Sequence, residues 1–170
     1  VISLGRSKPF RVRVVDGDGE PLQADVRAVR SELVAGPSDL RLRISSNPGV
    51  DGAYPITWLA EGDVLVRAGG RDGWGCVART VDTRTTELVE LCLRAGVTVS
   101  LSGLELGVDD ALVIENMDGE VLYGDRSAGR NFCLSPRTYR MIVLRGETEV
   151  RRVSFEVGDK PMDLSVEEGQ

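Results

Sequence analysis

Hydrophobic and polar residues alternate along most of the chain with the two-residue period of a half-buried β-strand. The clearest case is the segment 10–14, which reads Phe-Arg-Val-Arg-Val. No long window shows the 3.6-residue apolar period of an amphipathic helix. The pattern predicts an all-β protein with strands at 10–14, 26–30, 40–44, 64–68, 76–81, 88–93, 97–101, 112–114, 121–123, 131–134, 139–144, 150–157 and 162–166.

Glycine-rich turns separate these segments. Asp16-Gly17-Asp18-Gly19 follows the first predicted strand, and Asp118-Gly119 separates two later ones. Asp-Gly supplies the positive φ that a tight hairpin needs. The stretches 32–39 and 45–52 are predicted loops. Many short strands joined by such turns are typical of a β-sandwich or barrel.

An internal repeat appears when the first half of the chain is shifted by 76 residues. The match is one of apolar phase more than of identity. It predicts two tandem domains, 1–95 and 96–170, with so short a connection that we expect a stiff, elongated pair. The coinciding positions are Ile56 with Phe132, Trp58 with Leu134, Leu65-Val66 with Met141-Ile142, Val77 with Val153, Val81 with Val157, and Leu88 with Leu164.

The first half also carries a family pattern in the segments 12–16, 20–26, 51–59 and 61–66. This pattern, over residues 9–94, resembles the carboxypeptidase regulatory-like domain. The resemblance implies a transthyretin-like, Ig-like β-sandwich in which Asp51-Gly52 turns into a central strand, Leu59 fills the core and Gly62 allows a reversal. In the second half Thr138 stands where that glycine would fall. Residues 96–170 are therefore expected to be a degenerate copy or a different Ig-like sandwich.

Composition narrows the chemistry. The chain has 170 residues and no histidine, which excludes Ser-His-Asp and Cys-His catalysis and imidazole zinc sites. Its 21 Lys+Arg against 27 Asp+Glu give a net charge of −6, which argues against a nucleic-acid partner. No apolar run approaches the length of a membrane span. Nearly all the basic residues are arginine, a bias typical of a GC-rich bacterial genome.

Three cysteines raise the question of a disulfide. A hairpin centred on Arg84 would place Cys76 opposite Cys92, with Cβ atoms about 4.5–5.5 Å apart, which is near disulfide range. The pair is thus a disulfide candidate of an exported protein. The other interpretation is two buried, reduced thiols that pack as small hydrophobic groups. Cys133 lies in an apolar strand, and we expect it to be buried.

Two aromatic residues are candidate binding residues. Trp74 lies in a loop of four glycines, beside Arg71, and could stack on a sugar ring or dock on a protein. Tyr123 is the second candidate. The other interpretation of Trp74 is a side chain that packs against the end of the sandwich. Asp16, Asp18 and Glu20 superficially resemble a calcium loop, but the later positions do not fit and a turn is expected.

We therefore expect a non-catalytic structural or protein-interaction module, a stalk or accessory pair of sandwiches in a larger bacterial protein. The resemblance implies an accessory role beside catalytic domains, and no catalytic residue carries over. A carbohydrate-binding module using exposed aromatics is the alternative. No enzyme activity, cofactor or metal is expected. A protein partner and an exported or cell-surface location are expected, with the cytoplasm as the other option.

Overall fold

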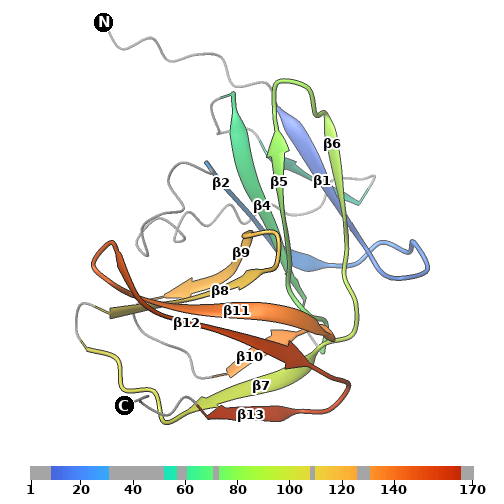
Figure 1. The fold of residues 1–170 in the computed structure, drawn as a ribbon. Helices are drawn as coiled ribbons and strands as arrows, with labels where there is room; N and C mark the ends of the chain where they lie inside the picture. Colours follow the sequence, from blue (N-terminus) through green and yellow to red (C-terminus); the bar gives the residue numbers. More distant parts are fainter. Residues whose placement is uncertain are drawn as a thin grey trace, which may run out of the picture.

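The computed structural model describes residues 9–30, 52–56, 61–70, 73–107, 110–125 and 131–165. Every regular element among them is a β-strand, so the all-β prediction is confirmed (Figure 1). The predicted strand at 40–44 and the predicted loop at 32–39 lie outside the described residues, as do Trp58 and Leu59.

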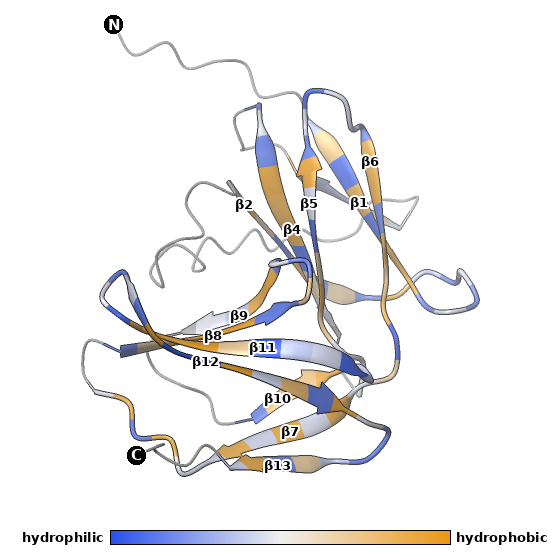
Figure 2. Cartoon of the chain, in the orientation of Figure 1, coloured by the Kyte–Doolittle hydropathy of each residue, from blue (hydrophilic) through white to orange (hydrophobic). Residues whose placement is uncertain are grey.

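Among the described residues, the first sandwich contains two three-stranded sheets. Its first sheet has the order β3-β1-β6, and its second has the order β2-β4-β5. Apolar side chains alternate with charged ones along the strands, which is visible along β1 in Figure 2. The strands are β1 (Phe10–Val15), β2 (Ala24–Arg30), β3 (Ala53–Ile56), β4 (Asp63–Gly70), β5 (Val77–Asp82) and β6 (Leu88–Cys92).

The second sandwich has one three-stranded and one four-stranded sheet. The smaller sheet has the order β10-β7-β13, and the larger has the order β12-β11-β8-β9. Residues 93–96 connect β6 to the first strand of this sandwich. The strands are β7 (Val97–Ser102), β8 (Asp110–Asn116), β9 (Val121–Asp125), β10 (Asn131–Leu134), β11 (Arg137–Arg145), β12 (Thr148–Val157) and β13 (Met162–Ser165).

The two sandwiches share a topology. In the first, β1 pairs antiparallel with β3 and parallel with β6. In the second, β7 pairs antiparallel with β10 and parallel with β13. The strands β8-β11-β12 correspond to β2-β4-β5, and β9 pairs with β8 at the edge of that sheet; the segment of the first sandwich that would match β9 lies outside the described residues. All strand ladders among the described residues stay within one sandwich, but the predicted boundary between residues 95 and 96 itself remains a prediction.

The 76-residue repeat places its described residue pairs in corresponding strands, although the side-chain phase fails at two of them. Leu65 lies on the outer face of its own sandwich and is buried against the second sandwich. Its counterpart Met141 instead points into the core of its own sandwich. Leu88 is 38% exposed, and the buried residue of β6 is its neighbour Val89. A one-residue slip moves a strand side chain to the opposite face, so these two matches were out of phase.

The first sandwich has an apolar core of its own. The core lies between its two sheets, and Tyr54, Val64 and Leu91 are among its fully or nearly fully buried side chains. The phenolic oxygen of Tyr54 accepts a hydrogen bond from the backbone N–H of Ala24 at 2.9 Å, which joins β3 to β2. β3 is an edge strand of its sheet, so the expectation of a central strand there was wrong.

The second core extends into the first sandwich. Its cluster contains Leu112, Met141 and other residues of the second half, together with Val29, Leu65, Cys76 and Ala78 from the first half. The sheet β2-β4-β5 is therefore covered on both faces. Figure 1 shows β8 and β9 lying beneath these strands, with the strands of the two sandwiches running in different directions. The predicted stiff, elongated pair did not anticipate this contact, in which apolar residues on the outer face of β2-β4-β5 are buried against the second sandwich.

The predicted turns are present. Asp16 Oδ1 accepts the backbone N–H groups of Asp18 and Glu20, both at 2.9 Å, which closes the turn after β1. Gly119 has a φ of 83° and turns β8 into β9. Gly62 has a φ of 140°, which a residue with a Cβ rarely adopts, and it lies directly before the start of β4 at Asp63.

Candidate functional site

Trp74 does not stand out from the surface as a binding platform. Its side chain is half-buried and packs against the core of the first sandwich. Its backbone forms an isolated antiparallel bridge with Ala95. Arg71 lies outside the described residues. This packing favours the second interpretation of Trp74, a side chain that packs against the sandwich.

Tyr123 is also engaged within the protein. Its ring meets Phe132 edge to face, with centroids 5.1 Å apart, and its hydroxyl donates to the backbone carbonyl of Cys133 at 3.1 Å. Burial raises its pKa above the ordinary value. Both aromatic candidates are therefore half-buried and packed within the protein, and carbohydrate binding through them remains a prediction.

The hairpin register predicted for the cysteines was wrong. β5 pairs with β4, and β6 pairs with β1 in the other sheet, so Cys76 and Cys92 are not cross-strand neighbours. All three cysteines are free thiols. Cys92 is exposed, and its Sγ lies 3.3 Å from the carbonyl oxygen of Asp16. Cys76 is buried, and Cys133 is half-buried rather than buried as expected.

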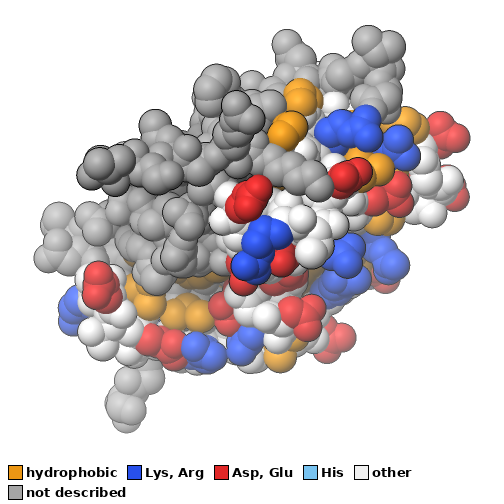
Figure 3. All heavy atoms as spheres, turned by 90° about the horizontal axis from the view of Figure 1, so that it is seen from above, with side chains coloured by type: hydrophobic (Ala, Val, Ile, Leu, Met, Phe, Trp, Pro, Cys, Tyr) orange, Lys and Arg blue, Asp and Glu red, His pale blue; other side chains and the backbone are white. Residues whose placement is uncertain are grey.

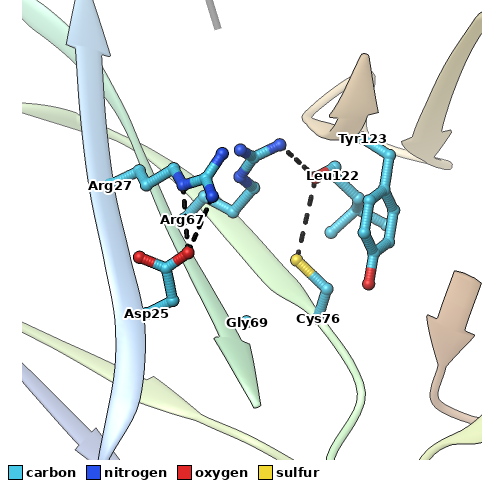
Figure 4. Close-up of a pocket in the computed structure, with 7 residues that line it drawn as sticks. All are labelled: Asp25, Arg27, Arg67, Gly69, Cys76, Leu122 and Tyr123. Atoms are coloured by element: carbon cyan, nitrogen blue, oxygen red, sulfur yellow. Dashed lines mark hydrogen bonds and ion pairs between the residues drawn. The ribbon is translucent and has the colours of Figure 1, made fainter. Parts of the chain in front are cut away.

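A cavity of about 160 Å³ lies where β2 and β4 of the first sandwich meet β9 of the second (Figure 4). Charged side chains from the first sandwich form one side, and the second sandwich contributes an apolar and an aromatic residue. Gly69 leaves part of the wall without a side chain. The lining residues are Asp25, Arg27, Arg67, Gly69, Cys76, Leu122 and Tyr123.

Two arginines face each other across the strands at this cavity. Arg27 and Arg67 are direct partners in the β2–β4 ladder. Arg27 donates from Nε and Nη2 to the same Asp25 oxygen, at 3.2 and 2.7 Å. Like charges directly opposite each other destabilise a strand pair. Asp25 is thus the one carboxylate that lines the cavity beside the guanidinium groups of Arg27 and Arg67.

On the side of the second sandwich, a backbone carbonyl of β9 accepts a hydrogen bond at the cavity. The oxygen of Leu122 accepts a hydrogen bond from Nη1 of Arg67. The Sγ of Cys76 lies 3.8 Å from the same oxygen. Burial lowers the pKa of Arg67, and the nearby Arg27 lowers it further. The Arg67–Leu122 hydrogen bond thus joins the two sandwiches at the edge of the cavity.

Cys76 does not have the character of a nucleophile. Burial raises the pKa of its thiol to about 12, in spite of the opposing effect of Arg67. Since the thiolate is the reactive form, this thiol stays protonated at neutral pH. Cys76 therefore acts as a packed apolar residue in the shared core.

Further backbone contacts join the sandwiches. The N–H of Thr80 in β5 donates to Glu120 Oε1 at 2.5 Å. The hydroxyl of Ser135 donates to the carbonyl of Arg94 at 3.3 Å, and the N–H of Cys76 donates to the carbonyl of Cys133 at 3.3 Å. These contacts and the shared core bring β5 and the connection at 93–96 against β9 and β10.

Two acidic side chains, Asp16 after β1 and Asp110 at the start of β8, stabilise the fold. Asp16 binds backbone N–H groups of its own turn. Asp110 accepts a hydrogen bond from Arg145 Nε at 2.9 Å and another from the N–H of Gly107. These bonds, with that of Arg145 the largest effect, lower the pKa of Asp110. Within the described ranges, no three potential metal-ligating side chains gather at one place.

The surface seen from above mixes both signs of charge. Basic and acidic side chains are interspersed over the described part of this face (Figure 3). No helix long and apolar enough to cross a membrane occurs in the part of the chain that the structure describes.

No protein-family model and no curated protein matches the chain. The resemblance to the carboxypeptidase regulatory-like domain therefore remains an expectation. Solved structures give distant matches. The Bacillus anthracis TIE protein has 14% identity and a TM-score of 0.36, over 94% of this chain and 33% of that one. The streptococcal ancillary pilin has 13% identity and a TM-score of 0.37, over 97% of this chain and 62% of that one.

The shaft pilin SpaA from Lactobacillus rhamnosus GG has 11% identity and a TM-score of 0.33, over 93% of this chain and 96% of that one. This chain thus spans a third of the TIE protein and 62% of the ancillary pilin. TM-scores this low identify no shared fold, and we transfer no function from these proteins.

The sequence did not single out Asp25, Arg27 or Arg67. The arginines occupy the polar positions of alternating strands, where a solvated face is the ordinary expectation. The available signal was Gly69-Gly70 at the end of β4, because a glycine in a strand leaves space that a side chain would otherwise fill.

Proposed function

We propose that this chain is a non-catalytic structural module in which two β-sandwiches form one rigid spacer of a larger, exported bacterial protein. The observation that supports this proposal most directly is the shared apolar core. Leu65 and Cys76 are buried on the outer face of the first sandwich, in one cluster with residues of the second. Burial of apolar side chains between the two sandwiches opposes hinge motion, because opening the hinge would expose them to water.

The rotational tumbling of the two sandwiches tests this proposal. In ¹⁵N relaxation measurements on the whole chain, a rigid spacer gives the same correlation time for amides of β1–β6 and of β7–β13. Two shorter and different correlation times would mean that the sandwiches move independently, and the proposal would fail. The measurement needs no labelled side chain, so the shared core stays intact.

We further propose that the protein partner of this module is a second copy that pairs through β12. β12 has ten residues, and no strand pairs with its outer edge among the described residues. Val150 near its start is 48% exposed. An open edge strand offers unpaired backbone groups to another strand.

The charges of β12 fit antiparallel pairing with itself. Arg152, Ser154 and Glu156 alternate along one face, and all three side chains are exposed. With Ser154 at the two-fold axis, Arg152 of each copy lies opposite Glu156 of the other. Within one copy Arg152 forms an ion pair with Glu149 at 2.6 Å, so Glu156 of the partner would be a second carboxylate for the same guanidinium. Opposite charges at such positions stabilise a strand pair by about 0.2–1 kcal/mol each.

Charge reversal tests the dimer. Sedimentation velocity should show concentration-dependent association, weakened at least several-fold by Arg152→Glu and restored by Arg152→Glu combined with Glu156→Arg. A chain that stays monomeric at all concentrations would contradict the β12 proposal. So would a double variant as weak as the single one. Neither result bears on the rigidity of the spacer.

A further inference from the structure

The cavity between the sandwiches contains an imbalance of charge that the spacer role does not require. Arg27 and Arg67 stand opposite each other on β2 and β4, and Asp25 is the carboxylate beside them. Asp25 pairs with Arg27 through one oxygen, Oδ2. Arg67 makes its hydrogen bond to a neutral backbone carbonyl, that of Leu122. Two positive charges are therefore compensated by one negative charge.

Both arginines have hydrogen-bond donors left over. A guanidinium has five N–H groups. Arg67 uses Nη1 for Leu122, and Arg27 uses Nε and Nη2 for Asp25. Both arginines are half-buried, and both line the cavity. Their remaining N–H groups are therefore donors that a group bound in the cavity could use.

The surroundings suit a small charged group. The cavity of about 160 Å³ has room for several water molecules, and so for a small oxyanion. Gly69 leaves the floor near Arg67 free of a side chain, as Figure 4 shows. Leu122 and Tyr123 form an apolar wall, which strengthens hydrogen bonds to an ion held against it.

We propose that Arg27 and Arg67 bind a small oxyanion, a carboxylate or a phosphate, that bridges the two guanidinium groups in the cavity between the sandwiches. Guanidinium groups match the paired oxygens of these anions and form strong, charge-assisted hydrogen bonds with them. The anion would also remove the repulsion between the facing arginines. This site is independent of the spacer role and of β12.

Calorimetric titration of the whole chain tests the proposal, with sodium phosphate and sodium acetate as probes and sodium chloride at matched ionic strength as the reference. Saturable binding of phosphate, acetate or both, beyond the chloride reference, is the expected result. Binding of phosphate alone identifies a phosphate site, and binding of acetate identifies a carboxylate site. No saturable binding of either anion would overturn the proposal.

The Arg27→Gln variant locates the site. It leaves the Arg67–Leu122 hydrogen bond in place and should weaken binding about tenfold or more, the size of one charge-assisted hydrogen bond. The matched control is Arg79→Gln, which removes the same charge from an exposed position of β5 outside the cavity. Equal affinity for wild type and Arg27→Gln, or equal weakening in both variants, would overturn the proposal. Because Arg27 is partly exposed, its replacement should leave the unfolding temperature nearly unchanged, which a melting curve checks.

Discussion

The two sandwiches have the same strand pairing, but they contribute different parts of the corresponding sheets to their junction. In the first, the sheet β2-β4-β5 carries buried residues on both faces. In the second, the corresponding sheet has β9 at its edge, next to β8. This edge strand supplies Leu122 and Tyr123 to the junction. The junction thus joins the outer face of one sheet to the edge strand of the corresponding sheet.

The comparison also separates two kinds of buried residue in one sheet. Val64 and Val66 point into the core of the first sandwich, while Leu65 between them is buried against the second. A half-buried strand would have a polar residue at the position of Leu65. An apolar residue on both faces of a strand therefore marks a sheet that has a second partner.

The largest effect is expected from Leu65→Ala compared with Leu91→Ala. Both leucines are buried, Leu65 against the second sandwich and Leu91 in the core of the first. Each truncation should lower the free energy of unfolding by about 2–5 kcal/mol. Leu65→Ala should in addition separate the thermal unfolding into two steps, because it weakens the junction.

Differential scanning calorimetry of both variants checks this expectation. Leu91→Ala serves as the matched control, since it removes the same side chain from a core that belongs to one sandwich. Two resolved transitions in Leu91→Ala, or a single unchanged one in Leu65→Ala, would argue against a shared core.

A smaller effect is expected from Gly96→Ala in the connection between the sandwiches. A Cβ at Gly96 would lie 2.7 Å from Sγ of Cys133 and 2.7 Å from the Cα and N of Gly75. Because a backbone segment cannot give way easily, this variant should lose about 1–3 kcal/mol of stability. Urea denaturation measures the loss.

The matched control is Gly158→Ala, at a glycine with no heavy atom within 4 Å of an added Cβ. Its stability should change by about 0.5 kcal/mol or less. Equal losses of stability in the two variants would show that the close backbone approach of Gly75 and Gly96 does not limit the stability of the protein.

A pH-dependent effect is expected at Asp110 in the second sandwich. The hydrogen bond from Arg145 holds the pKa of Asp110 below its ordinary value. A carboxyl with a lowered pKa in the folded state stabilises the protein above its unfolded pKa of about 3.9, and this stabilisation is lost as the pH falls through the folded pKa. The urea midpoint of wild type should therefore fall more steeply below pH 4 than that of Asp110→Asn. Parallel curves for the two proteins would contradict this role of the ion pair.

The smallest expected effect is a difference in the rates at which the three cysteines are chemically modified. Cys92 is exposed, whereas Cys76 is buried and has a pKa raised to about 12. In the folded protein at pH 8, iodoacetamide should modify Cys92 first, Cys133 more slowly, and Cys76 after unfolding. Intact mass spectrometry follows the modification. A non-reduced chain two hydrogens lighter, with Cys76 and Cys92 protected together, would instead show the disulfide.

The strand pattern predicted most of the fold because alternation reflects which face of a strand is buried. Segments such as 10–14 and 131–134 were placed well for this reason. The pairing of Cys76 with Cys92 failed because consecutive strands can enter different sheets, and local sequence does not determine which. A hairpin and a crossover between sheets have similar turn residues.

The cavity could not be predicted in the same way. Arg27 and Arg67 are 40 positions apart, and their opposition depends on the β2–β4 register. Their contact with Leu122 depends further on how one sandwich packs against the other. Sequence periodicity describes single strands and does not contain that information. It predicted Trp74 and Tyr123 as exposed because glycine-rich loops and strand ends are usually at the surface.

Calorimetry of the unmodified chain tests the shared core most directly. If the two sandwiches form one cooperative unit, heat unfolds the chain in a single transition whose van't Hoff enthalpy equals the calorimetric enthalpy. Two transitions, or a van't Hoff enthalpy near half the calorimetric value, would mean that each sandwich unfolds by itself and that the junction does not couple them.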